Sequence, residues 1–182
     1  MLRVTIPDND LLDLDTLRIT HIKGATVELE YSLSAIAKWE SKWHIPFLTS
    51  AERTLSKEQL GSFVACMALN EVEDERIFSV IPNDVMAKIA EYMNDPMTAT
   101  TISKDPNRPT SKRLTVMTAE QFYHLMFKCG IPPDWEFRHM NQLVMLIRVC
   151  EETDNPRQMS KAEILKQNRE LNRARLASRK KR

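Results

Sequence analysis

The pattern of apolar and polar residues changes near residue 32. Before that point the two kinds alternate with a period near two, which is typical of β-strands with one buried face. The alternation runs through residues 2–6, 16–22 and 25–32. These segments predict a small antiparallel β element within residues 1–31, with Lys23 and Gly24 at one of its turns.

From Ser32 onward, apolar residues recur at the three- and four-residue spacing of helices. In the first helical segment, Trp39 and Trp43 lie on one face with aliphatic residues, and Pro46 closes the segment. Another helix is expected from Pro82 to about Asn94. Residues 134–152 are the most apolar helical segment, so we expect them at the centre of the core.

Capping boxes mark the starts of three helices, because a hydroxyl and a carboxylate or amide side chain three residues later can satisfy free backbone N–H groups. They lie at residues 56–59, 118–121 and 160–163. Gly130 is expected to end the helix that begins after Thr118.

Together these elements predict an α+β fold that is mainly α-helical, with a small N-terminal antiparallel β element, a helical body and a projecting basic C-terminal helix. Because 182 residues suffice for one core, we expect a single globular domain over residues 1–156 and a helical tail over 157–182. Residues 95–117 hold three prolines and no helical period, so we expect a hairpin-like excursion there.

Composition limits the chemistry that the chain can perform. Three glycines leave little material for phosphate-binding loops, whereas ten methionines suit adaptable apolar packing. The sequence holds no nucleophile elbow, Walker loop or dinucleotide fingerprint, so we expect no enzyme activity and no cofactor. No segment is long and apolar enough for a membrane span, and no signal peptide is recognisable, so we expect a cytosolic protein.

Cysteines and histidines give no metal-binding pattern. Cys66, Cys129 and Cys150 are widely spaced in apolar helical segments, which predicts three buried free thiols. With His124 and His139, the last two cysteines match no common zinc module, so we expect no metal. The acidic run Glu71–Glu75 fits either a divalent cation site or a solvated connection between helices, and we favour the connection.

Charge is distributed unevenly although the net charge is only +1. Residues 160–182 carry nine basic and two acidic side chains, a net charge of +7, which leaves −6 on the rest of the chain. Arg169, Arg173 and Arg175 could contact nucleic-acid phosphates, an acidic partner or the acidic body. The tail lacks aromatic residues for base stacking, so we favour the protein contacts over nucleic acid.

Four stretches resemble a group of small proteins encoded in the tail-gene region of tailed bacteriophages, from about residue 26 to the end. Their patterns are EYSL-x-x-I/L-x-KWE-x-KW-x-x-PFL at Glu30–Leu48, D-P-M-T-A-T-T-I at Asp95–Ile102, L-I-R-V-C at Leu146–Cys150 and M-S-K-x-E-I-x-x-x-N-R-x-L-N-x-A-R-R/L at Met159–Leu176.

The resemblance implies a tail assembly chaperone, which coats the apolar helical tape-measure protein and brings tail-tube subunits to it in the cytoplasm of the infected host. It also implies that this chain is the shorter of two forms, the longer one arising by ribosomal frameshifting. Two alternatives remain open: a minor structural protein of the virion neck, tail or baseplate, and a nucleic-acid-binding accessory protein that acts through the tail. Self-association is a further expectation.

We expect the partner-binding residues among apolar side chains and tail arginines. For Trp39 and Trp43 both a place in the core and contact with a partner remain open, and we favour at least one of the two rings in the core. The candidates are Trp39, Trp43, Phe47, Met97, Ile102, Arg169, Arg173 and Arg175. Of the two tryptophans, Trp43 is expected to be the more buried because it lies beside Pro46, and Trp39 is expected to meet another chain.

Overall fold

The computed structural model describes the chain outside residues 14–17, 49–54, 101–116, 155–164, 166–167 and 170–182. The chain divides into two compact units, Met1–Val149 and Cys150–Arg182. The domain boundary that the sequence places after residue 156 stays a prediction.

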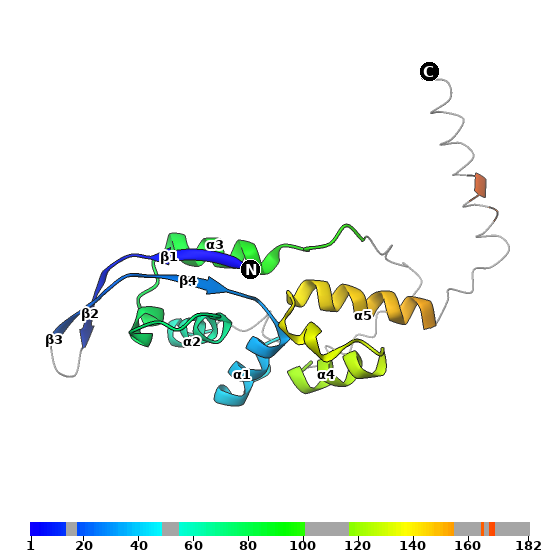
Figure 1. Cartoon of the computed structure of the whole chain (residues 1–182), viewed down its shortest axis with the longest axis horizontal. Coiled ribbons are helices and arrows are strands. Elements are labelled where there is room, and N and C mark those ends of the chain that lie inside the picture. The colour runs from blue at the N-terminus through cyan, green and yellow to red at the C-terminus, as the bar shows by residue number, and fades with distance from the viewer. Residues whose placement is uncertain (14–17, 49–54, 101–116, 155–164, 166–167, 170–182) are drawn as a thin grey trace, which may run out of the picture. The chain divides into compact units, whose positions relative to one another are not determined.

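The N-terminal residues form one long antiparallel hairpin (Figure 1). Strand β1 (Leu2–Ile6) pairs with β4 (Ala25–Leu29), and β2 (Asn9–Asp13) pairs with β3 (Arg18–Ile22). Ile6 lies opposite Ala25 and Asn9 lies opposite Ile22, so one register continues through both pairs. The two ladders are therefore parts of one ribbon.

The prediction of a turn at Lys23 and Gly24 is wrong, because these residues lie within the ribbon where its ladder is interrupted. Pro7 has no N–H to donate to the ladder. Beside it, Asp8 Oδ1 accepts a hydrogen bond from Gly24 N at 2.6 Å. A Cβ atom on Gly24 would lie 2.6 Å from Ile6 O and 2.8 Å from Asp8 N, so only glycine allows the two strands to approach this closely.

Five α-helices and two short 3₁₀ helices occur among the described residues. They are α1 (Leu33–Trp43), α2 (Lys57–Met67), η2 (Glu75–Ser79), α3 (Asn83–Asn94), α4 (Ala119–Lys128), η3 (Pro133–Phe137) and α5 (Met140–Asp154). The fold is therefore α+β and mainly helical, as the sequence predicts.

Local hydrogen bonds explain where the helices begin and end. Ser56 and Gln59 form the predicted capping box at α2. Gln121 Oε1 accepts from Thr118 N at 3.2 Å at the start of α4. Gly130 has a φ of 65°, the left-handed conformation that ends a helix readily at glycine. The capping box at residues 160–163 lies outside the described residues.

The core of the Met1–Val149 unit lies between the β1–β4 ladder and the helices. Val4 and Ile6 on β1 and Val27 and Leu29 on β4 are buried with apolar residues from each α-helix. Helix α1 contacts α2, α4 and η3. The central helix is thus α1, and the expectation that residues 134–152 occupy this place is wrong: they form η3 and α5, with a break between them.

The buried carboxylate of Glu40 joins three parts of this core. Its Oε1 accepts from Phe47 N and its Oε2 accepts from Ala119 N, each at 2.7 Å. The same side chain thereby holds the segment after α1 and the first turn of α4, where a negative charge is favourable. This contact brings Phe47 back over α1.

The edge of β4 is covered by the end of α2. Leu69 N donates to Glu28 O at 2.8 Å, and Glu30 N donates to Met67 O at 2.9 Å. Backbone groups at a strand edge need such partners when water is excluded. The pairing also fixes Glu30, which lies just beyond β4.

Two predicted segments fall largely outside the described residues. Residues 95–100 follow α3 without regular secondary structure, and the rest of the predicted excursion up to residue 116 is not described. In the tail, Leu165, Asn168 and Arg169 are helical and exposed. The hairpin-like excursion and the projecting tail helix stay predictions.

Candidate functional site

Residues Asp95–Met97, which follow α3, are held by side chains from the start of α5. Asn141 Nδ2 donates to Met93 O at 3.0 Å and to Asp95 O at 2.6 Å. Gln142 Nε2 donates to Met97 O at 3.2 Å. Met97 has a φ of 49°, which is unusual for a residue with a long side chain, so these bonds stabilise a strained backbone.

Glu30, just beyond β4, lines the same region. Its Oε1 accepts from the Tyr92 hydroxyl at 2.6 Å, and its Oε2 lies 2.7 Å from the nitrogen of Met1. Its side chain is only 12% exposed. Burial, and then the bond to Glu30, raise the pKa of Tyr92, so its hydroxyl stays protonated and able to donate.

His139 precedes α5 and is 4% exposed. Its Nε2 lies 3.2 Å from Tyr92 O, and its Nδ1 accepts from Asn141 N at 3.3 Å. The ring also meets Tyr31 and Tyr92 edge to face, with centroids 5.4 and 4.9 Å away. Burial lowers the pKa of His139 and favours the neutral ring.

These groups surround a cleft of about 370 Å³, which we call the Met97 cleft. Its lining residues are Met1, Glu30, Tyr92, Met97, Phe137, Arg138, His139 and Gln142. At the rim, Met1 is 66% and Phe137 is 59% exposed. Glu30 and His139 already have partners within the protein. The cleft therefore offers the thioether and aromatic groups of Met1, Met97 and Phe137 beside the exposed, charged side chain of Arg138, which suits contact with a partner that has both apolar and polar groups.

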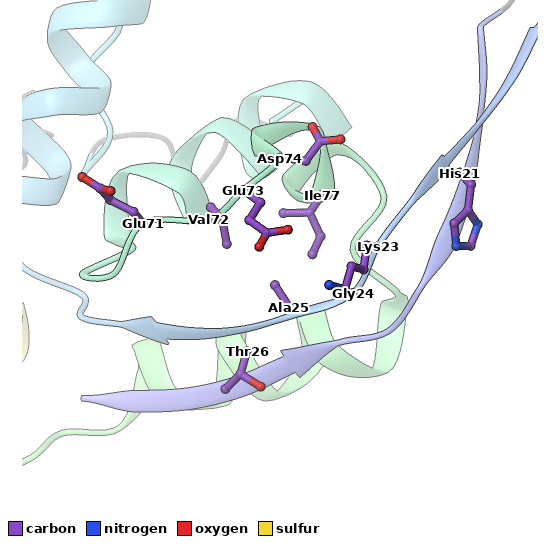
Figure 2. A pocket seen from close by; sticks show the side chains of 10 residues that line it. All are labelled: His21, Lys23, Gly24, Ala25, Thr26, Glu71, Val72, Glu73, Asp74 and Ile77. Atoms are coloured by element: carbon purple, nitrogen blue, oxygen red, sulfur yellow. The ribbon is translucent and has the colours of Figure 1, made fainter.

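A second cleft, of about 460 Å³, lies between the hairpin and the acidic connection (Figure 2). Glu71, Glu73 and Asp74 line it, but Figure 2 shows their carboxylates spread along the connection and not converging on one point. Asp74 is paired with Arg76, with Nη2 to Oδ2 at 2.8 Å, and this hydrogen-bonded pair lowers the pKa of Asp74. Within the described residues, no three His, Cys, Asp or Glu side chains gather closely enough to hold a metal ion.

The predicted burial order of the two tryptophans is wrong. Trp39 is 0% exposed, and its Nε1 donates to Gln59 O at 3.0 Å. Trp43 is only partly buried, and its Nε1 donates to Ser62 Oγ at 3.0 Å. Trp43 is the last residue of α1, where the chain turns away at His44 with a φ of 54°, whereas Phe47 folds back over Trp39.

The structure does not bring the predicted partner residues together at one site. Trp39 is internal, and Phe47 is partly buried and stacked on Phe63 at 3.9 Å between centroids. Met97 is half-buried at the cleft, while Arg169 is exposed in the other unit. Ile102, Arg173 and Arg175 lie outside the described residues.

The cysteines are less buried than expected. Cys66, Cys129 and Cys150 form no disulfide, and each is only partly buried. Burial raises the pKa of the Cys66 thiol. This thiol therefore stays protonated at neutral pH.

Three residues of structural importance escaped the sequence interpretation: Glu30, Glu40 and His139. Glu40 falls on the apolar face of α1 by helical spacing, which was the available signal for a buried carboxylate. Glu30 and His139 offered no local signal, because their contacts reach residues about 45 to 60 positions away in the chain.

Comparisons with protein-family models, with curated proteins and with solved structures found no match for this chain. Among the described residues, none of the helices is both long and apolar enough to cross a membrane. The class that fold and cleft define is thus an α+β, mainly helical protein with a cleft whose rim combines apolar and charged side chains.

Proposed function

We propose that this chain is a tail assembly chaperone of a tailed bacteriophage, which binds the apolar helical tape-measure protein and helps to recruit tail-tube subunits in the host cytoplasm. The observation that carries the proposal is the Met97 cleft. It is built from residues of the phage-like stretches, Glu30 and Met97, together with the first turn of α5. Its rim exposes the apolar side chains of Met1 and Phe137 beside the charged side chain of Arg138.

The chemistry of the rim supports such a task. A chaperone for a long repetitive helix must accept many similar apolar side chains and later release them. Methionine suits this, because its flexible and polarizable thioether adapts to different shapes, and an exposed phenylalanine adds contact area. Met1, Met97 and Phe137 supply these groups at one cleft.

The first experiment is co-expression of the chain with the tape-measure protein of the same phage. We expect the tape-measure protein to stay soluble and to co-purify with the chain. Phe137→Asp should reduce co-purification at least tenfold, because it places a charge in the apolar contact. Phe127→Asp is the matched control: Phe127 is 60% exposed against 59% for Phe137, but it does not line the cleft.

A second variant, Met97→Asn, guards against misfolding. Asparagine tolerates the left-handed backbone that Met97 adopts, so this change should preserve the fold while it removes the thioether. We expect weaker capture and an unchanged unfolding midpoint. Capture that is unaffected by both Phe137→Asp and Met97→Asn would overturn the assignment to this cleft.

Quantitative mass spectrometry of purified virions separates a transient chaperone from a structural component. A chaperone is displaced when the tail tube polymerises, so we expect at most trace amounts in the particle. A fixed copy number in washed virions would favour the minor structural protein of neck, tail or baseplate.

A further inference from the structure

His139 is the N-cap of α5. The first N–H groups of a helix have no partner within the helix and need an acceptor from outside. The carbonyl of His139 accepts from Gln142 N at 2.9 Å and from Leu143 N at 3.3 Å. Its ring Nδ1 accepts from Asn141 N at 3.3 Å, the role that an Asn, Asp or Ser side chain usually has.

One ring nitrogen of His139 faces a hydrogen-bond acceptor and the other faces a donor, and this determines which nitrogen carries the proton. Tyr92 O can only accept, so the Nε2 atom that faces it at 3.2 Å carries the hydrogen. Nδ1 is then the unprotonated nitrogen that Asn141 N needs. Only the neutral ring with the proton on Nε2 satisfies both contacts.

A second proton on Nδ1 would replace attraction by repulsion. The ring would point an N–H group at the N–H of Asn141, and it would place a positive charge at the positive end of the α5 dipole. The cap of α5 would then be lost.

Charged and titratable groups from each neighbouring element face this ring. Glu30 beyond β4 and Asp95 beyond α3 favour the protonated ring, whereas the Met1 nitrogen before β1 opposes it. Tyr92 of α3 stays neutral, and so does Tyr31, because burial raises the pKa of Tyr31 to about 12. Burial is the strongest influence on His139 and favours the neutral ring.

We propose that His139 is an acid-sensitive latch whose protonation releases the first turn of α5 and, with it, the segment Asp95–Met97 of the cleft. The connection is direct, because Asn141 and Gln142 in this turn hold the carbonyl oxygens of Asp95 and Met97. At neutral pH Asp95–Met97 is held in place at the cleft. Acidification releases this segment.

The direction of the pH dependence follows from linkage. His139 has a lower pKa in the closed state than the ordinary histidine value of about 6.5, which the open state approaches. The open state therefore binds the proton more readily. The latch is fully stable above about pH 6.5 and weakens as the pH falls toward the closed-state pKa.

Hydrogen exchange of assigned amides in the full chain tests the latch between pH 7.5 and 5. The equilibrium constant for opening at Asn141 should rise as the pH falls below 6.5, by at most about tenfold per pH unit because one proton is taken up, and should level off below the closed-state pKa of His139. The Met97 methyl signal should move in the same transition as the His139 ring. His139→Asn keeps a good N-cap without a titrating group, so its opening should not depend on pH.

His21→Asn is the matched control, because His21 is exposed and its pKa is raised by its bond to Asp10. This variant should keep the full pH response at Asn141. Three results would overturn the latch: no pH response at Asn141 in the wild type, a response that persists in His139→Asn, or protection at Asn141 equal to that of Phe63 in α2 at every pH. The last would mean that only global unfolding exposes α5. Because the wild-type titration alone can give the first or third result, the latch stays testable if His139→Asn does not fold.

Discussion

The ring of Trp39 is enclosed by three aromatic side chains, Trp43, Phe47 and Phe63, with centroids at 6.2, 5.2 and 6.4 Å. Large aromatic side chains contribute most to a core when they are fully desolvated and their polar atom has a partner. Trp39 meets both conditions, because its Nε1 bonds to Gln59 O. Its role is to hold α1 against α2.

Trp39→Ala should therefore destabilise the fold by about 3–5 kcal/mol, the range for truncating a fully buried aromatic residue. Trp43→Ala is the matched control and should cost about 1–2 kcal/mol, because its ring is partly exposed. Urea unfolding followed by circular dichroism measures both. Equal losses for the two variants would contradict the burial order.

Glu40 is a buried charge with two backbone partners, so both of its oxygens are needed. In Glu40→Gln, one oxygen becomes an NH₂ group that must face the N–H of Phe47 or Ala119. We expect a loss of about 2 kcal/mol in the free energy of unfolding, the usual effect of leaving a buried donor unsatisfied. Glu91→Gln, at an exposed position on α3, should change stability by less than about 0.5 kcal/mol. A similar loss in both variants would show that charge removal alone matters.

At the scale of elements, the contact between α2 and η2 depends on a glycine inside a helix. A Cβ atom on Gly61 would overlap the carbonyl oxygen of Phe78. Glycine normally lowers the stability of a helix interior by about 1 kcal/mol relative to alanine, so helix propensity does not explain why position 61 is glycine. The close approach of η2 explains this.

Gly61→Ala therefore tests which effect dominates. Propensity alone predicts a gain of about 1 kcal/mol. Overlap with a backbone oxygen predicts a cost of about 1–3 kcal/mol, because η2 must shift. We expect net destabilisation, measured as a lower urea midpoint. A raised midpoint would mean that η2 moves away without loss.

The helices were predictable because their signals are local. Ser56 with Gln59, and Gly130, mark helix ends through contacts within a few residues, and the structure confirms them. Strand β2 was not predicted, because Asn9–Asp13 has two adjacent leucines and three polar residues that disfavour strands. It forms as a strand because β3 pairs with it in the long hairpin.

The Met97 cleft and the order of the tryptophans could not be predicted from local signals. Helical spacing places Trp39 and Trp43 on one face of α1, but the return of Phe47 decides which ring is deeper. The cleft joins Glu30, Met97 and His139, which are far apart in sequence. Only the packing of β4, α3 and α5 brings them together.

For the whole molecule, the buried apolar core of the described residues extends from Val4 to Ile147. A chain that ends at Asp154 keeps this core and every helix of the Met1–Val149 unit. We expect it to unfold at the same urea concentration as the full chain, within error. A clear loss of stability would show that residues 155–182 contribute to the fold.

The same truncation tests the nucleic-acid alternative, because it removes the segment with net charge +7 and leaves an acidic chain. Sequence-independent electrostatic binding of a basic segment to DNA depends steeply on salt, because it releases counterions from the phosphates. We expect the full chain to bind duplex DNA weakly at about 50 mM salt and to lose that affinity by about 200 mM. The chain ending at Asp154 should not bind at either concentration. Affinity of the full chain that survives 200 mM salt would require contacts beyond charge, and the tail would then be a nucleic-acid-binding element.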